Sequence, residues 1–390
     1  MIITITNNLW QTTLQQNSTI TSPAQQKSVV MSCPARIYPL RKPENHRVPI
    51  PRWHLALPHD VTHVCTAYIG VQKHSDDPGS DYARDEAISA IRSWVEGEAG
   101  PSAYEMFSVM GGCDVEEATI WVCYWANTTT YQKWLEDLSL RVIYSRLPET
   151  GRASVGIWQE AFITEFPRLE TNYSGLDYLP GLARLPDSTF PEHTLSAYWG
   201  AARDRIPSSA FDLFPPSSNA PPPTPAPQGL GQHLTGTNVE NIAHIRSGQF
   251  WENCSQQEAD SYDTKLEPTL RTGLEYLWEN SPETGALGLR YLRNTNLSES
   301  DLSRPRKETC GAGFFTSLEA LETWAKSHRS HLAIYRGALT HYKVFGDKRK
   351  FRTWHEVSVL RAGDARFEYL NCVSQTGVIQ GVSLRVEDLK

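Results

Sequence analysis

Three short signatures occur twice in this chain, in the same order, and this repetition constrains the fold more than any other feature. The pairs are TAYIG (66–70) and SAYWG (196–200), YWANTTTYQKW (124–134) and FFTSLEALETW (314–324), and GIWQEAFI (156–163) and RTWHEVSV (352–359). The first pair lies in apolar, strand-like runs. The second combines an aromatic strand end, a capping region and a helical stripe, and the third alternates as a strand does. We therefore predict a duplicated core.

Each copy is predicted to run strand, helix, strand, strand, helix, strand, with first helices at residues 83–97 and 256–279. Such βαββαβ units are ferredoxin-like and carry their helices on one face of an antiparallel sheet. We expect an α+β fold in which two pseudo-duplicated ferredoxin-like units form a dimeric α+β barrel-type core. The predicted halves span residues 33–188 and 189–390.

Two segments are predicted to lie outside this core. Residues 1–32 should be a disordered N-terminal extension, because the first 26 residues carry no charged side chain and are rich in Thr, Gln, Asn and Ser. The Pro-rich insert at 214–232, FPPSSNAPPPTPAPQGLGQ, cannot hold a helix or a central strand. We expect it to be a surface loop between the first strands of the second copy.

Composition excludes several classes of partner. The formal net charge of −7 and the isoelectric point near 6.0 argue against nucleic acid. No run of eighteen apolar residues is present, so we expect no membrane span. The seven cysteines are scattered and never spaced as C-x-x-C, which indicates reduced thiols and a cytoplasmic location.

A duplicated scaffold commonly keeps one working cavity, so differences between the copies should mark it. The W-x-E strand carries Gln159 in the first half and His355 in the second. Alternation places His355 on an apolar face with Val357 and Val359. It is either a satisfied core histidine or a catalyst in a dry pocket.

The stretch WAKSHRSHLAIY (324–335) holds two further candidates, His328 and His331, where a helical pattern breaks into a strand-like apolar run. A histidine at a helix end can cap free carbonyls. It can also supply the single imidazole that a b-type haem requires. No Cys, Asp or Glu stands at zinc-ligand spacing around the pair, and no C-x-x-C-H motif for covalent haem is present.

From about residue 33 to the C-terminus the chain resembles the aldoxime dehydratases, haem lyases that convert aldoximes to nitriles. The segments that carry the resemblance are YWGAARDRIP (198–207), NIAHIRSGQFW (241–251), WAKSHRSHL (324–332), WHEVSV (354–359) and FEYLNCVSQTG (367–377). The resemblance implies ferrous haem b in the C-terminal half, with His331 as the iron ligand and His328 as a neighbour. It also implies catalytic roles for His355, Ser247 and Arg205.

Strand alternation agrees with part of this assignment, because Ser247 shares its predicted face with Ala243 and Ile245. Arg205 is expected on a strand face beside Arg203. Glu170 corresponds to a family glutamate, but Leu169 replaces the aromatic residue before it, so Glu170 stays outside the predicted set.

The implied chemistry is the loss of water from R–CH=N–OH, with His355 as acid and then base and with Ser247 and Arg205 holding the oxime oxygen. We expect a small-molecule aldoxime substrate, a homodimer and no nucleic-acid or membrane partner. The alternatives are another haem enzyme on a ferredoxin-like scaffold, of the peroxidase or chlorite-decomposing type, a non-catalytic haem-binding protein, and a barrel without cofactor.

Overall fold

The computed structural model of the protein describes residues 36–41, 50–217, 226–298 and 301–389. The extension predicted over residues 1–32 and the middle of the Pro-rich insert lie outside the described residues. The chain divides into two units, residues 1–36 and 37–390, and the second contains the helices and strands described below. None of the helices in the described part of the chain is long and apolar enough to cross a membrane.

The first half of this unit follows the predicted succession of strands and helices. Its elements are β2 (His63–Lys73), α1 (Ser80–Val95), β3 (Ala103–Gly112), β4 (Thr119–Trp125), α2 (Thr128–Asp137), α3 (Leu140–Arg146), α4 (Glu149–Arg152) and β5 (Val155–Glu165). The side chain of Asn127 accepts a hydrogen bond from the Thr130 amide at 2.9 Å, which satisfies a free amide at the start of α2. The aromatic strand end and capping region predicted for this half are therefore confirmed.

The second half repeats the succession after a long connection. Its elements are β9 (Ile242–Phe250), α6 (Gln256–Ser261), the π-helical turn η5 (Tyr262–Leu266), α7 (Glu267–Glu279), α8 (Ser281–Thr284), β10 (Ala286–Asn294), β11 (Glu308–Phe315), α9 (Leu318–Ser327), α10 (Arg329–Phe345), η6 (Gly346–Lys348) and β12 (Arg352–Leu360). Ser317 caps α9 as Asn127 caps α2, accepting from the Ala320 amide at 3.1 Å. The second predicted capping region is thus confirmed as well.

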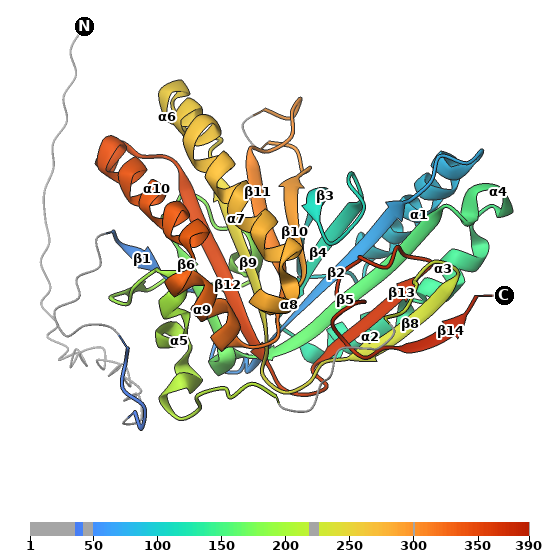
Figure 1. Ribbon diagram of the computed structural model, residues 1–390, viewed down its shortest axis with the longest axis horizontal. Helices are drawn as coiled ribbons and strands as arrows, with labels where there is room; N and C mark the ends of the chain where they lie inside the picture. Colours follow the sequence, from blue (N-terminus) through green and yellow to red (C-terminus); the bar gives the residue numbers. More distant parts are fainter. Residues whose placement is uncertain (1–35, 42–49, 218–225, 299–300, 390) are drawn as a thin grey trace, which may run out of the picture. The chain divides into compact units, whose positions relative to one another are not determined.

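The strands form one antiparallel sheet in which both halves have the same internal order. That order is β5-β2-β4-β3 in the first half and β12-β9-β11-β10 in the second, and β3 pairs with β10 where the halves meet. Short strands extend the two outer ends of this arrangement (Figure 1). They are β1 (Arg52–Trp53), β6 (Leu169–Tyr173) and β7 (Glu192–His193) beyond β12, and β13 (Ala365–Leu370), β8 (Gln232–Thr237) and β14 (Arg385–Asp388) beyond β5.

The two halves exchange edge strands. Strand β6 follows β5 in sequence but pairs with β12 of the second half. Strands β8 and β13 belong to the C-terminal part of the chain but extend the sheet beside β5. A residue on β6 can therefore contribute to a site built on the second half.

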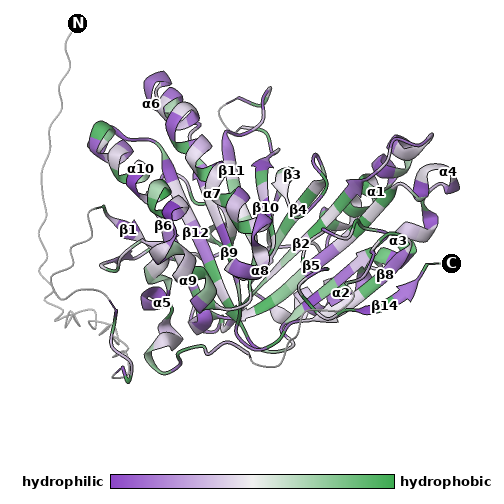
Figure 2. Ribbon diagram, viewed as in Figure 1, coloured by the Kyte–Doolittle hydropathy of each residue, from purple (hydrophilic) through white to green (hydrophobic). Residues whose placement is uncertain are grey.

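Apolar side chains form three clusters, one shared and one on the helical side of each half. The shared cluster joins Tyr68 and Trp158 of the first half to Phe314 and Trp354 of the second. Helices α1 and α2 cover the first half's other face, and α7 and α9 cover that of the second. Figure 2 shows green and purple residues along α1, as expected of a helix with one face on a sheet.

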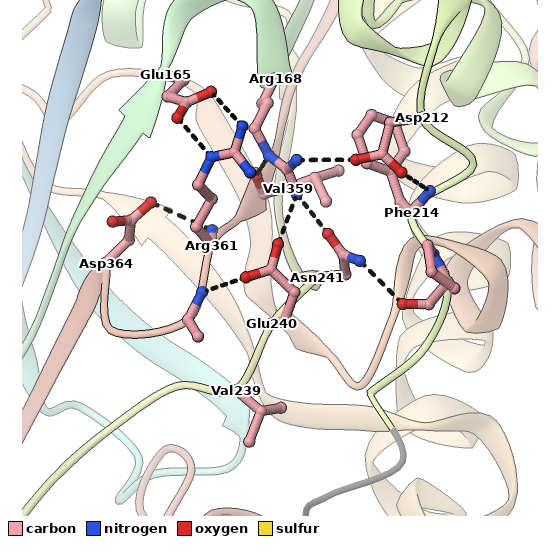
Figure 3. Close-up of polar contacts among 12 residues, drawn as sticks. Glu165, Arg168, Asp212, Phe214, Val239, Glu240, Asn241, Val359, Arg361 and Asp364 are labelled. Atoms are coloured by element: carbon pink, nitrogen blue, oxygen red, sulfur yellow. Dashed lines mark hydrogen bonds and ion pairs between the residues drawn. The ribbon is translucent and has the colours of Figure 1, made fainter.

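A buried arginine fixes the start of β6. Arg168 donates to the carbonyl of Val359 at 2.8 Å and to Asp212 at 3.1 Å, and it also bonds the side chain of Asn241 (Figure 3). Its guanidinium carries these bonds from the end of the first half to β12 and to the connection before β9. Because Glu170 lies two residues further along the chain, this network holds β6 where Glu170 reaches β12.

The first of the three sequence pairs is wrong. TAYIG lies in β2 as expected, but SAYWG (196–200) forms an irregular segment and the start of the 3-10 helix η3 (Trp199–Ala201). The true counterpart of Gly70 is Gly248 of β9. A Cβ at Gly70 would lie 2.1 Å from the Trp158 ring, and one at Gly248 would lie 2.2 Å from the Trp354 ring. Glycine is required at both positions because a cross-strand tryptophan covers them. The Pro-rich insert consequently precedes β9 and does not lie between the first strands of the second copy.

The segment that holds His328 and His331 is predicted only in part. Helix α9 ends at Ser327, and the extended residue His328 separates it from α10. The apolar run that follows, expected to be strand-like, is the start of the 17-residue helix α10. Arg205 likewise lies on the short helix α5 (Ala202–Arg205) and not on a strand.

Candidate active site

One row of neighbouring residues across the sheet differs between the two halves. In the second half this row borders a cavity, and in the first half large side chains fill the equivalent space. In the second half His355 pairs with Ser247, and Ser247 pairs with Gly311. The equivalent row in the first half consists of Gln159, Ile69 and Trp121. The fully buried Trp121 indole packs beneath the helices of its half, whereas Gly311 leaves this space without a side chain. This cavity therefore lies on the second half, which carries His355 where the first half carries Gln159.

The cavity lies between the sheet and helices α7, α9 and α10. Ser247, Thr353 and His355 line it from the strands, and Trp324 and His331 line it from the helices. Much of the remaining wall is aliphatic and comes from Leu266, Leu270, Leu274, Ile334, Ala338 and Leu339. Helix α10 buries His331 and His341 while its neighbouring side chains line the cavity, so the helix covers a space as well as a packed core.

His331 presents one nitrogen to this cavity. Its Nδ1 lies 2.9 Å from the carbonyl oxygen of Ala325, which is left free at the end of α9 and also accepts from the Tyr198 hydroxyl. This contact assigns the proton to Nδ1 and the lone pair to Nε2. Burial lowers the pKa of His331 to about 4, so the imidazole is neutral near neutral pH. A neutral imidazole with a free Nε2 is suited to bind a metal.

His328 is occupied elsewhere. Its Nδ1 lies 2.7 Å from the Ser330 hydroxyl, and its side chain caps α10. The ring also stacks on Tyr276, with centroids 3.8 Å apart. His328 caps a helix and is absent from the cavity wall, whereas His331 lines that wall.

His355 of β12 lies in a charged cluster with residues from β6 and α5. Its Nε2 lies 2.7 Å from Glu170 Oε1 and 3.0 Å from Arg205 Nη2. Asn172 lies 3.4 Å from the same nitrogen through its Nδ2. Arg205 also pairs with Glu170 directly, so the three groups form a closed triangle. Sequence reasoning left Glu170 out, and the structure places it at the centre.

The charges of this cluster follow from burial and pairing. Burial raises the pKa of Glu170, but the charges and hydrogen bonds of Arg205 and His355 lower it by more than burial raises it. The pKa of Glu170 therefore lies below its ordinary value. Burial lowers the pKa of His355, and Glu170 partly offsets this effect. Glu170 is therefore ionised at neutral pH, where His355 is mainly neutral and can take up a proton beside a fixed negative charge.

Ser247 and Arg205 occupy different places relative to the cavity. Ser247 lies on its wall as alternation predicted, and its hydroxyl has no hydrogen bond with the described residues. Arg205 lies behind His355, where Nη1 donates to the carbonyls of Tyr198 at 3.1 Å and Ala201 at 3.3 Å. Its contact with the cavity runs through His355. Arg203, by contrast, pairs with Glu322.

Two cavity residues escaped sequence reasoning altogether. Arg52 of β1 and Arg349, next to η6, both line the wall. Both lie outside the five resembling segments, and Arg349 stands among the basic residues of KVFGDKRKFR (343–352), a composition typical of a solvated surface segment. No signal in a single sequence marks them.

The residues present fit a b-type haem. One neutral imidazole faces an aliphatic and aromatic cavity, and on the opposite wall a histidine and a serine remain for a substrate. Among the described residues no group of three or more His, Cys, Asp or Glu side chains could hold a bare metal ion. The donor set therefore matches a metal that brings its own equatorial ligands.

Comparison with known proteins agrees with this chemistry. The sequence profile of the haem-containing dehydratase family matches residues 67–378. The aliphatic aldoxime dehydratase of Pseudomonas chlororaphis is 30% identical over 353 residues, which cover 90% of this chain and 96% of that protein. The phenylacetaldoxime dehydratase of Bacillus sp. (strain OxB-1) is 28% identical, over 86% of this chain and 93% of that protein.

Solved structures give the same answer. A crystal structure of an aldoxime dehydratase superimposes with a TM-score of 0.76 at 28% identity, covering 90% of this chain and 96% of that one. A second, an aldoxime dehydratase in complex with butyraldoxime, gives 0.76 at 27% identity, covering 90% and 94%. The chain belongs to the family of haem-containing dehydratases.

Proposed function

We propose that the protein dehydrates aldoximes, R–CH=N–OH, to nitriles and water with ferrous haem b held by His331 in the C-terminal half. The observation that carries this proposal is that His331 and His355 reach one cavity from a helix and from a strand. Similarity to aliphatic and phenylacetaldoxime dehydratases supports the substrate class. The butyraldoxime complex of a similar enzyme supports a small aldoxime in this cavity.

The reaction needs two proton movements and the cleavage of one N–O bond. When bound, ferrous haem supplies an electron-rich iron that can ligate the oxime nitrogen and weaken the N–O bond. His355 gives a proton to the departing hydroxyl, which leaves as water, and then takes the proton from the oxime carbon. Atoms balance because the proton lost from carbon restores the one given to oxygen. A positioned acid and base of this kind contributes about 10²- to 10⁴-fold.

The neighbouring side chains hold His355 and the oxime in place. Glu170 stabilises the imidazolium form of His355 across the 2.7 Å contact, and Arg205 keeps Glu170 ionised. Ser247 lies opposite His355 on the neighbouring strand, and its hydroxyl on the cavity wall can donate to or accept from the oxime oxygen. Arg205 acts on the oxime through His355 in this arrangement.

The variant His355→Ala tests the proposal. We expect it to keep haem and to lose nitrile formation by at least about 10²-fold, measured anaerobically with dithionite-reduced protein. Wild-type turnover in that variant would refute the assignment. Oxidation of substrates by peroxide, with no reaction of oximes under reducing conditions, would favour a peroxidase-type haem enzyme instead.

We also propose that the two halves are copies of one ferredoxin-like unit, with a boundary near residues 188 and 189, forming a barrel-type core. The identical strand order of the halves and the apolar cluster that they share support this proposal. A cytoplasmic homodimer remains part of it. The six described cysteines are free, in keeping with a reducing compartment, and light scattering after gel filtration tests the dimer.

A further inference from the structure

Two arginines face the cavity without a counterion. The Nη1 atom of Arg52 and the Nε atom of Arg349 are buried and have no hydrogen-bond partner. Among the described residues neither arginine forms an ion pair, although both contribute to the cavity wall. Arg349 is 9% exposed. The Arg349 guanidinium lies 4.8 Å from the centre of the Tyr342 ring, but buried cations are normally paired with an anion, and neither arginine has one among the described residues.

The electrostatics of the two side chains agree with the geometry. Burial, then Arg349, then Arg205 lower the pKa of Arg52 to about 9. Burial and then Arg352 lower the pKa of Arg349. Glu258 is the carboxylate that most raises the pKa of Arg349. It accepts hydrogen bonds from the amides of Lys350 and Phe351 and does not bond the guanidinium. The charge of Arg349 thus disfavours that of Arg52, and Glu258 and Asp177 only partly offset the effects that lower the pKa of Arg349.

The proposed substrate does not account for this charge. An aldoxime is neutral, and the proton that its dehydration moves is handled by His355 and Glu170. A porphyrin ligand differs, because haem b carries two carboxylates on one edge and apolar substituents on the other three. The cavity wall combines the same two kinds of group, with two arginines from β1 and the residue after η6 and with leucines from η5 and α7.

We propose that Arg52 and Arg349 bind the two haem propionates. This inference rests on the proposed haem site, and it adds the direction in which the macrocycle lies. The propionate edge points toward β1 and η6, and an apolar edge packs on Leu266, Leu270 and Leu274. Arg–carboxylate pairs are short, charge-assisted and frequently bidentate, so they fix orientation as well as affinity. In this role β1 completes the cofactor site even though it is a strand of two residues.

The test is haem release from the full-length holoprotein into an excess of apomyoglobin, followed at the Soret band. We expect Arg52→Gln/Arg349→Gln to release haem about 10- to 100-fold faster than the wild type. The resonance Raman propionate bending mode should shift in each single variant. The matched control is Arg271→Gln, which removes an arginine of α7 that is paired with Glu267 and should leave both readouts unchanged.

A second measurement separates charge recognition from general loosening of the fold. The full chain reconstituted with haem dimethyl ester, which lacks propionate charge, should lose its cofactor faster than the haem b form. The double variant should no longer distinguish the two cofactors. Arg52→Lys/Arg349→Lys should recover part of the discrimination, because the charge is kept and the bidentate geometry is lost.

Release of haem from the double variant at the wild-type rate would overturn the inference. So would a variant Arg52→Gln whose only change is the KM for an oxime, since Arg52 would then contact substrate. Both outcomes leave the proposed reaction standing, because haem retention is measured without oxime. A wild-type protein that binds no haem would instead remove the proposed function and this inference together.

Discussion

Glu170 Oε1 lies 2.7 Å from His355 Nε2 although the two residues are 185 positions apart in the chain. The pairing of β6 with β12 creates this contact, and Arg168 anchors the start of β6. The carboxylate raises the pKa of a histidine that burial alone lowers. The protonation of His355 therefore depends on β6, a strand that follows the first half in sequence and pairs with the second half.

Replacing Glu170 tests this dependence. Glu170→Gln removes the negative charge, so the pKa of His355 falls further and its protonated form becomes scarcer at a given pH. We expect turnover near neutral pH to drop by about 10- to 100-fold. The alkaline side of the kcat profile should move to lower pH while haem content stays unchanged. The control is Glu165→Gln, because Glu165 pairs with Arg361 away from the cavity. An unchanged pH profile in Glu170→Gln would contradict the assigned role.

The two histidines of WAKSHRSHLAIY should behave differently. We expect His331→Ala to lose the Soret band, because no other imidazole on that wall has its Nε2 free toward the cavity centre. His328→Ala should keep haem and lose about 1 kcal/mol of stability as a helix cap is removed. Pyridine haemochrome assays give the haem content of each variant. Loss of haem from His328→Ala alone would transfer the ligand assignment to that residue.

Sequence patterns predicted correctly the features that depend on neighbouring residues in the chain, such as strand alternation and helix capping. Alternation placed His355, Val357 and Val359 on one face of a strand, and the capping residues before α2 and α9 were recognised from their side chains. The prediction that SAYWG (196–200) forms a strand was wrong. Its composition is typical of a strand, but contacts with distant parts of the chain determine its backbone conformation. Arg205 binds the Tyr198 carbonyl and draws that segment toward Glu170. Tertiary hydrogen bonds therefore override the apolar pattern.

The missing site residues failed for a related reason. Glu170 becomes a site residue through pairing of β6 with β12, and no alternation pattern within β6 names its partner strand. Arg52 and Arg349 stand out because buried nitrogen atoms of their guanidinium groups have no hydrogen-bond partner. This feature depends on the folded surroundings and cannot be recognised in the sequence. The start of α10 was misassigned because LAIY (332–335) is a short apolar run, and such a run can belong to a helix or to a strand. Further along, Ile334, Ala338 and Leu339 keep helical spacing on the cavity wall.

Gly311 lies beside Ser247 of the cavity wall and beneath Leu274, so a large side chain at this position should displace Leu274 into the cavity and exclude the cofactor. A Cβ at Gly311 would already lie 3.2 Å from Leu274 Cδ2, and an indole would extend far into the space. The first half tolerates Trp121 at the equivalent position. We expect Gly311→Trp to fold and to contain much less haem, as measured by circular dichroism and haem content. Gly311→Ala, which needs a shift of a few tenths of an ångström, should retain haem. Full haem occupancy in Gly311→Trp would place the cofactor elsewhere.

His244 should limit stability in acid. It is buried among Tyr68, Phe162 and Phe314, with ring centroids 4.6 to 5.3 Å away, and burial followed by the charge of Arg290 lowers its pKa to about 3. An unfolded histidine titrates near 6.5, so between these pH values the unfolded chain binds more protons than the folded protein. The stability that neutral His244 contributes is present above about pH 6.5 and is lost as the pH falls toward 3.

His244→Phe should reduce the acid-induced loss of unfolding free energy by about 1 kcal/mol per pH unit in this range. Urea unfolding at about pH 7 and about pH 5 measures the difference, with His59→Gln, a change at an exposed histidine, as the control. An equal loss of stability in the wild type and His244→Phe would show that other groups govern acid unfolding.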